Sequence, residues 1–271
     1  MGKTISVHAN EIILTRDGEY KAEFEMLADM LNHCDNDLKK FIIMNGKNIR
    51  ASDHAGAIRL INDTQIEILP KVGSIQASKT LMLNKLCSAA DLPYSYGEIS
   101  ESVKKDEAFI EFFVEMFIKE CMSIIKRGLI SEYRTIEENS NILRGRLMFA
   151  KNIRNNFYHS EKFYVQYEEF TIDKAENRLM KSAAEILLKI TGIHQNITQL
   201  RHILRYLDGV NYSENFDDDF ARCMDSRNSK KYVNMLNICR IFMQNHSIKQ
   251  YSDKNVIYAM FWQNNDKSYT P

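Results

Sequence analysis

The sequence has no excess of charge of either sign. Its 36 lysine and arginine residues equal its 36 aspartate and glutamate residues, so the formal net charge at pH 7 is zero. A protein that holds DNA mainly through its own surface is usually basic. We therefore expect that this chain does not grip DNA by itself, although a local basic patch is compatible with neutrality.

The sequence also lacks paired cysteines, a secretory signal and a long uninterrupted hydrophobic run. Its five cysteines are odd in number and form no C-x-x-C pair, which predicts reduced thiols in a cytosolic protein. Charged and polar residues interrupt the apolar runs at the N-terminus. The richest apolar stretch, residues 109–125, contains four charged residues and indicates a buried helix rather than a membrane span. We expect a cytoplasmic protein without membrane contact.

Several motifs that carry chemistry are absent or incomplete. Gly2-Lys3-Thr4 matches only the tail of a phosphate-binding loop, because the upstream glycine is missing. His194 and His202 have no cysteine nearby and do not suit a zinc site. No Gly-x-Ser-x-Gly elbow occurs. We expect no catalytic residue, no metal and no cofactor in this chain.

A magnesium-dependent nuclease of the restriction type needs a separate acidic residue and then an Asp/Glu-x-Lys tripeptide on adjoining strands. Two tripeptides fit the second part, Glu19-Tyr20-Lys21 and Asp37-Leu38-Lys39. Patterns of three residues arise easily by chance. A nuclease that uses Asp37 and Lys39, or a site that the sequence does not reveal, is kept only as an alternative. The run Asp217-Asp218-Asp219 indicates the exposed start of a helix rather than a metal site.

The apolar pattern predicts an α+β protein. Residues 1–76 are expected to form a mixed domain rich in strands, with one strand within 5–14 and a hairpin formed by 57–61 and 65–69. Residues 77–261 are expected to form a mainly helical domain, and residues 262–271 a loose tail.

Within the helical domain, one long helix is expected to begin at Asp106 and to end at Gly128. A second helix is expected to be capped by Asp173. The helical period breaks over residues 128–138, and residues 163–166 suit a strand.

Two clusters of polar residues stand out within the helical domain. Arg144-Gly145-Arg146 places two forked donors beside a freely bending backbone, which suits carboxylates, phosphates or a partner's carbonyl groups. Tyr167-Glu168-Glu169-Phe170 is followed by Glu176-Asn177-Arg178-Leu179 at the start of a helix. Local ion pairs and helix capping are the alternative interpretation of both clusters.

The order and spacing of these clusters resemble the McrC family. The resemblance covers about residues 1–260. Its most specific parts are Arg144-Gly145-Arg146-Leu147 and Asn177-Arg178, and the strand Ile66-Glu67-Ile68-Leu69-Pro70-Lys71 supports them. Further matching segments are 55–60, Arg127-Gly128-Leu129, 167–170 and the helix at 232–242.

The resemblance implies a subunit with a β finger near residues 128–170 that enters the pore of a McrB-like AAA+ GTPase ring and stimulates GTP hydrolysis. GTP and Mg²⁺ would be bound by the partner, which would also read modified cytosine in DNA, so this chain would reach modified DNA through the complex. The residues implied to bind the partner are Arg144, Gly145, Arg146, Glu169, Asn177 and Arg178. Family members continue beyond residues 258–261 into a PD-(D/E)xK nuclease, and we expect this chain to lack that domain.

Two other functions remain open at this point. One is the nuclease described above, which a plasmid-cutting assay with Mg²⁺ would detect. The other is a non-catalytic DNA-binding module that uses Arg127, Lys151 and Arg154 together with the two finger arginines. Salt-dependent DNA binding by the isolated chain would favour that module.

Overall fold

The computed structural model describes residues 3–33, 39, 41–94, 97, 99, 108–224, 227–243 and 256–262. The candidate nuclease residue Asp37, the expected helix cap Asp106 and residues 263–271 of the expected tail lie outside the described residues.

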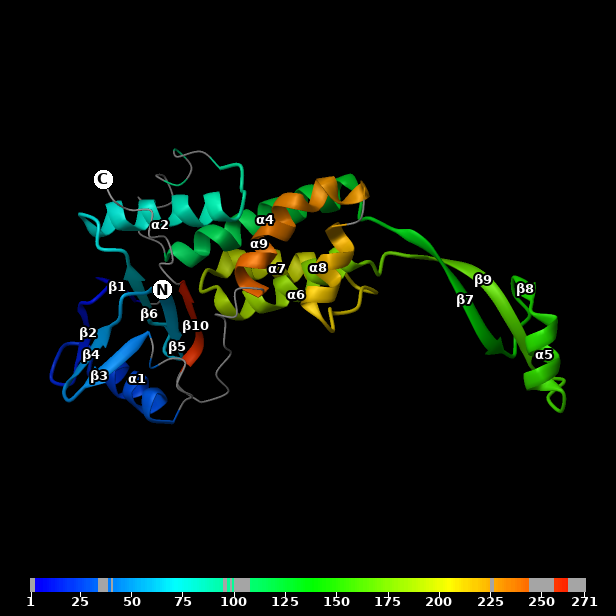
Figure 1. The fold of residues 1–271 in the computed structure, drawn as a ribbon, viewed down its shortest axis with the longest axis horizontal. Helices are drawn as coiled ribbons and strands as arrows, with labels where there is room; N and C mark the ends of the chain where they lie inside the picture. The colour runs from blue at the N-terminus through cyan, green and yellow to red at the C-terminus, as the bar shows by residue number, and fades with distance from the viewer. Residues whose placement is uncertain are drawn as a thin grey trace.

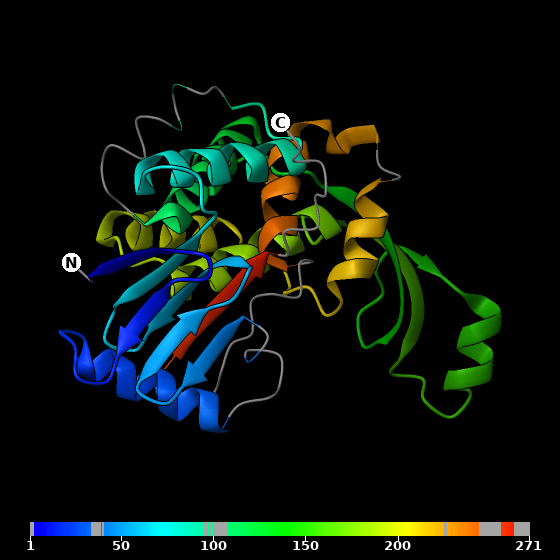
Figure 2. The ribbon, with the colours of Figure 1, turned by 60° about the vertical axis from the view of Figure 1, so that its left-hand side comes forward.

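Two small sheets form the N-terminal part of the molecule (Figures 1 and 2). The first has the strand order β1-β6-β5-β10, formed by Thr4–His8, Gln65–Leu69, Ala55–Leu60 and Val256–Trp262. The second has the order β2-β4-β3, formed by Ile12–Thr15, Asn48–Ala51 and Ile42–Asn45. Strand β1 is parallel to β6, and the other pairs are antiparallel.

The first sheet is covered on both faces. One face of the first sheet packs against helix α1 (Lys21–His33) and the second sheet. This face contributes Ile58, Ile66 and Ile68 to the shared core. The opposite face contributes Ala57 and Leu69 to the core of the helical part. All five residues of β6 are therefore buried, as expected for a strand packed on two sides.

The predicted hairpin is confirmed, because β5 and β6 pair with Ala57 opposite Glu67. The single strand expected within residues 5–14 is instead two strands, β1 and β2. The chain turns between them at Asn10, whose φ is 64°. Asparagine tolerates this left-handed conformation better than most residues. Asn10 therefore allows the chain to turn between β1 and β2.

Strand β10 joins the N-terminal sheet from a distant part of the chain. Residues 256–261 were assigned to the helical domain and Trp262 to the loose tail, yet this strand pairs antiparallel with β5 from Trp262 opposite Ala55 to Val256 opposite Leu60. The N-terminal sheet is thus built from both ends of the described chain (Figure 2).

The helical body packs beside this sheet (Figure 1). Its elements are α2 (Ile75–Ala89), α4 (Phe109–Arg127), α6 (Ala175–Ile190), α7 (His194–Tyr206), α8 (Phe216–Met224), the 3-10 helix η2 (Arg227–Tyr232) and α9 (Val233–Met243). Helix α4 supplies buried residues at helical spacing, including Phe113, Phe117 and Cys121. It ends at Gly128, with φ 88°, as predicted.

The predicted cap of the second helix is wrong. Helix α6 follows Lys174 and has no side-chain cap hydrogen bond. The Asp173 carboxylate instead accepts hydrogen bonds from the backbone N–H and the side-chain amide of Asn211, at 2.9 and 2.8 Å. The Asp173 carboxylate is therefore occupied by Asn211, a residue distant in the sequence, and does not cap the helix.

The predicted α+β class, with a strand-rich N-terminal part, a helical body and a projecting β finger, is confirmed. The finger extends away from the body on the side opposite the N-terminal sheets (Figure 1). Within the described parts of the chain, no helix combines the length and the apolar character needed to cross a bilayer.

Candidate partner-binding finger

The finger consists of residues 132–171, which leave and re-enter the body at Ile130 and Ile172. Its stem is the antiparallel pair β7 (Glu132–Ser140) and β9 (Phe163–Thr171), in register from Glu132–Thr171 to Ser140–Phe163. Near the far end, the short strand β8 (Arg146–Leu147) pairs with β9, and helix α5 (Phe149–Asn156) follows it. Nine residues in each stem strand extend about 30 Å.

Arg144 is bound within the finger. Its guanidinium donates to the Glu138 carboxylate at 2.7 Å and to the hydroxyl of Tyr167, and it stacks 3.8 Å from the centre of the Tyr167 ring. The Glu138 hydrogen bond is the main reason that the pKa of Arg144 is raised. These contacts connect the loop after β7 to both β7 and β9. Arg144 therefore stabilises this part of the finger.

Gly145 occupies a position where a side chain would crowd the neighbouring strand. Its φ is 65°, and a Cβ atom there would lie 2.4 Å from the Gln166 carbonyl oxygen and 2.6 Å from the Tyr167 Cβ. Both atoms belong to β9, which the backbone approaches closely at this point. The glycine therefore allows Arg146 to enter β8 directly after the turn.

Arg146 differs from Arg144 in having an unused side chain. Its backbone pairs opposite Gln166, but its exposed guanidinium makes no hydrogen bond or ion pair with any residue that the structure describes. The same holds for Arg154 on α5 within the described range. Lys151 on α5 is paired with Glu137. Glu169 is exposed on β9, opposite Arg134.

Helix α5 turns its polar side toward the stem. Asn156 exchanges two hydrogen bonds of 2.8 Å with Asn139 of β7 and donates a third to Asn152. Asn152 in turn accepts from the backbone N–H of Tyr164, also at 2.8 Å. These amides hold the helix on the stem, and its large apolar residues Phe149 and Ile153 remain exposed.

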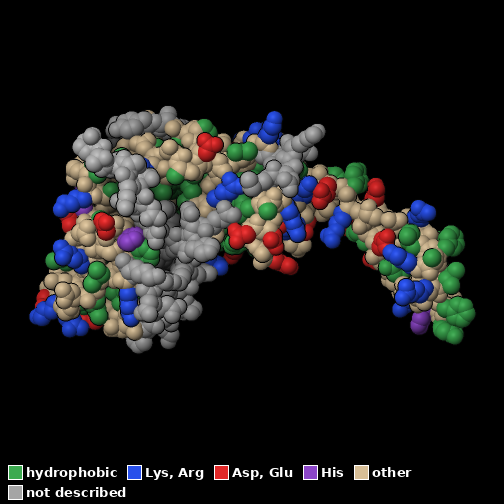
Figure 3. Space-filling view, viewed as in Figure 1, with side chains coloured by type: hydrophobic (Ala, Val, Ile, Leu, Met, Phe, Trp, Pro, Cys, Tyr) green, Lys and Arg blue, Asp and Glu red, His purple; other side chains and the backbone are tan. Residues whose placement is uncertain are grey.

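The apolar residues of α5 point to solvent. Phe149, Ile153 and Phe157 follow each other at intervals of four residues and are 71%, 63% and 73% exposed. We call the exposed hydrophobic residues at this end the apolar tip, which consists of Ile142, Leu143, Phe149, Ile153, Phe157 and Tyr158. Figure 3 shows hydrophobic side chains gathered at the far end of the finger. Patches of this kind mark interaction sites.

Asn177 lies at the other end of the finger and is fully buried. Its side-chain amide donates to the carbonyl oxygens of Ile130 and Ile172, at 2.9 and 2.7 Å. The resemblance to the McrC family implied that Asn177 binds the partner. The Asn177 side chain is not on the surface, because burial and three internal hydrogen bonds engage it.

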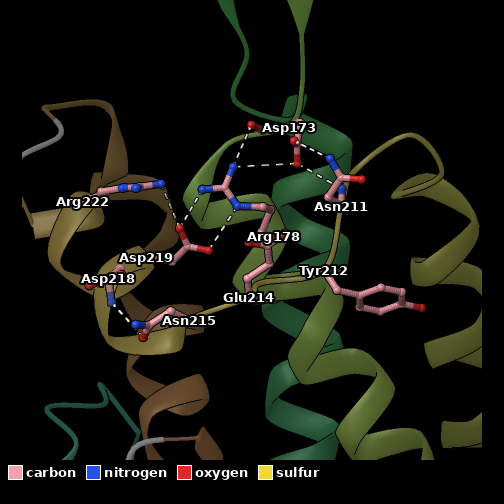
Figure 4. A pocket seen from close by; sticks show the side chains of 9 residues that line it. All are labelled: Asp173, Arg178, Asn211, Tyr212, Glu214, Asn215, Asp218, Asp219 and Arg222. Atoms are coloured by element: carbon pink, nitrogen blue, oxygen red, sulfur yellow. Dashed lines mark hydrogen bonds and ion pairs between the residues drawn. The ribbon is translucent and has the colours of Figure 1, made fainter.

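Arg178 makes a bidentate ion pair with Asp219 of α8, with N–O distances of 2.6 and 3.1 Å, and also donates to the Asp173 carbonyl oxygen. Its guanidinium points between Asp173 and Asp219 in a cavity of about 490 Å³ (Figure 4). The pKa of Arg178 is raised mainly by the Asp219 hydrogen bond. The predicted acidic helix start is confirmed, since α8 begins at this run and Asp217 and Asp218 are exposed, but Asp219 itself is buried.

The candidate DNA-binding cations do not form one patch. Arg127 lies at the end of α4, next to the base of the finger, where it donates to the backbone and hydroxyl oxygens of Ser123. Lys151 and Arg154 lie on α5 at the far end (Figure 1). Among the described residues, no group of three or more His, Cys, Asp or Glu side chains could hold a metal ion.

Two residues of the finger base were missed by the sequence reasoning. Tyr232 and Asp219 are separated from their partners Asn177 and Arg178 by 55 and 41 residues, so no local pattern connects them. The outward apolar side of α5 carried a signal that could have been used, the four-residue spacing of Phe149, Ile153 and Phe157.

The sequence is similar to that of a known restriction enzyme. In one curated relative, the type IV methyl-directed restriction enzyme EcoKMcrBC of Escherichia coli (strain K12), 131 residues align at 27% identity. The alignment covers 48% of this chain and 37% of the relative's length.

Solved structures share the fold. The cryo-EM structure of the Thermococcus gammatolerans McrBC complex matches with a TM-score of 0.64 and 16% identity, over 96% of this chain and 82% of the other. A refined half-complex of Thermococcus gammatolerans McrB AAA+ hexamers with bound McrC matches with a TM-score of 0.64 and 17% identity, over 95% and 66%.

The family match itself covers most of the sequence. Residues 49–266 match the family described as McrBC 5-methylcytosine restriction system component. This chain therefore belongs to the family of McrBC 5-methylcytosine restriction system components.

Proposed function

We propose that this chain is a McrC-like subunit that binds a McrB-like AAA+ GTPase ring through its finger and stimulates GTP hydrolysis. The proposal includes that GTP and Mg²⁺ are bound by the partner, that modified DNA is reached through the complex, and that this chain has no nuclease site of its own. The similar Thermococcus gammatolerans assembly consists of McrB AAA+ hexamers with bound McrC, which supports this choice of partner.

The observation that carries the proposal is the exposed surface of the finger. The apolar tip and the guanidinium of Arg146 project into solvent, and neither has a partner among the described residues. A protein gains nothing in its own stability from six exposed hydrophobic side chains, but it gains affinity when a partner buries them. Arginine adds directional hydrogen bonds to acidic or carbonyl groups at the rim of such a contact.

Stimulation of this kind needs no chemistry from the finger. A ligand shifts an equilibrium between two states of a motor when it binds one state more tightly than the other. A finger that prefers the hydrolysis-competent arrangement of the ring would therefore raise the GTPase rate.

The two finger arginines have different expected effects. The purified chain is titrated into a McrB-like GTPase, and the steady-state rate of GTP hydrolysis is followed. We expect Arg146→Ala to lower the maximal stimulated rate about tenfold, the effect of losing a charge-assisted hydrogen bond of about 1.5 kcal/mol. Arg144→Ala should instead loosen the finger and raise the half-saturating concentration, and the double variant should show both effects and so lower stimulation.

Unchanged stimulation by the double variant at saturating protein would reject the role of these arginines. The same reactions contain supercoiled plasmid and Mg²⁺, and we expect no cutting by this chain alone. Cutting without a partner would instead favour the nuclease alternative.

A further inference from the structure

The two strands of the finger are joined at their base by a closed set of hydrogen bonds. Asn177 of α6 donates to the carbonyl oxygens of Ile130 and Ile172, the residues at which the chain leaves and re-enters the body. Tyr232 completes the set. Its hydroxyl accepts from the backbone N–H of Ile130 at 2.9 Å and donates to the Asn177 side-chain oxygen at 2.8 Å.

Both side chains of this set are inaccessible to solvent. Asn177 and Tyr232 each have 0% exposure. Burial raises the pKa of Tyr232 to about 12, so its hydroxyl keeps its proton and remains a donor at neutral pH. Removing one member of such a set leaves a buried polar group without its hydrogen bond, which lowers the free energy of unfolding. Neither residue can touch a binding partner without unfolding the base of the finger.

The helix that carries Asn177 is held firmly at its other end. The Arg59 guanidinium of β5 donates to the Ile190 carbonyl oxygen, the last residue of α6. The Glu111 carboxylate of α4 accepts from the Thr191 hydroxyl at 2.6 Å and from the Gly192 N–H at 2.7 Å. Helix α6 therefore connects the base of the finger to α4 and to the N-terminal sheet.

The finger stands clear of the body beyond this point (Figures 1 and 2). A rotation of about 10° at the base of a 30 Å stem moves its end by about 5 Å. Small changes at the base therefore decide where the apolar tip and Arg146 lie.

We propose that Asn177 and Tyr232 are positioning residues, which fix the direction of the finger before a partner binds and so set its affinity for the ring. This inference rests on the proposed function for its last step. A finger already held in its bound direction loses less conformational freedom on binding. A loosened finger should bind more weakly but should reach the same stimulated rate once the ring is saturated.

The test uses Tyr232→Phe, which removes one hydroxyl and keeps the ring. The matched control is Tyr206→Phe on α7, a half-exposed residue whose hydroxyl has no hydrogen bond within the described residues. Amide hydrogen exchange is measured first on the isolated full chain. We expect exchange of the Ile130 amide to become at least tenfold faster, while the buried turns of α4 keep their protection.

The second measurement is the GTPase titration with the partner. We expect Tyr232→Phe to raise the half-saturating concentration about tenfold and to leave the maximal rate within twofold of the original. A second variant, Lys174→Gln, removes the ion pair to Glu132 at the surface of the same base and leaves the core intact. It should raise the half-saturating concentration about twofold.

The outcomes separate the two proposals. Unchanged Ile130 exchange, or faster exchange throughout α4 and α6, would overturn the positioning role. So would a lower maximal rate at an unchanged half-saturating concentration. If the original chain gives no stimulation, the proposed function fails, while the exchange result still decides whether Tyr232 fixes the base of the finger.

Discussion

At the scale of single residues, Gly145 is a position where the finger has little room for a side chain. We expect Gly145→Ala to cost about 2 kcal/mol, because the left-handed backbone costs 1–2 kcal/mol with a side chain and the new Cβ would press on the backbone of β9. The Met148 amide, which donates to the Tyr164 carbonyl oxygen beside this turn, reports the change. Its exchange should become about thirtyfold faster.

Gly46 provides the matched comparison for that substitution. Its φ is 61°, close to that of Gly145, but nothing lies within 4 Å of the position of its Cβ. Gly46→Ala should therefore show the backbone cost alone, about 1 kcal/mol. Equal effects of the two substitutions on local exchange would mean that the close approach of β9 is unimportant.

Some single-residue roles could be predicted from the sequence, and others could not. Gly128 follows the last residue of an apolar helix, a local pattern, and it ends α4 as predicted. Asp173 and Asp219 are bound by Asn211 and Arg178, which lie far away in the sequence. An aspartate near a helix start usually caps the helix or faces solvent. Asp173 and Asp219 instead bind side chains that are distant in the sequence, which a local pattern does not reveal.

At the scale of elements, α5 is a helix whose apolar side faces solvent. Replacing Phe149 and Ile153 with serine should change the stability of the chain by less than about 0.5 kcal/mol, because both side chains are exposed. It should raise the half-saturating concentration for GTPase stimulation at least tenfold, because a buried side chain of this size contributes about 1.5–3 kcal/mol.

The control for this prediction lies on the opposite end of the molecule. Ile43 of β3 is half-exposed on the second N-terminal sheet, and Ile43→Ser should leave the titration unchanged. Thermal unfolding and the GTPase titration are measured on the same preparations. Equal titration curves for the α5 variant and the original chain would show that Phe149 and Ile153 do not contact the partner.

Elements were predictable where their pattern is local. The long helix that ends at Gly128 and the β5–β6 hairpin show periodicities of their own, and both are confirmed. Helix α5 begins only at Phe149, because Arg146 and Leu147 pair with β9 as a strand. That pairing depends on a segment about twenty residues further along the chain, and periodicity within a short window does not include it.

At the scale of the whole molecule, the Arg178–Asp219 pair connects α6 to α8 and gives stability a dependence on acid. Burial raises the pKa of Asp219, but hydrogen bonds from Arg178 and Ser213 and the nearby arginine charges outweigh it, so the pKa lies below the ordinary 3.8. The stabilisation is therefore fully present above about pH 3.8 and is lost as the pH falls through the lower folded-state pKa.

We expect Asp219→Asn to lower the free energy of unfolding by about 2 kcal/mol at pH 7, the scale of hydrogen bonds to a charged group. The difference from the original chain should shrink below pH 3.8. Urea unfolding at several pH values measures both effects. Asp218→Asn, on the exposed neighbour, should have little effect at any pH. A difference that persists undiminished in acid would exclude the ion pair as its source.

Strand β10 has a consequence for the way this chain emerges from the ribosome. The edge of β5 that it covers is synthesised some two hundred residues earlier. Until residue 262 has been made, the hydrogen-bonding groups along that edge have no strand beside them, and such edges invite pairing with other chains. Synthesis of the helices and the finger is thus complete before the first sheet can close.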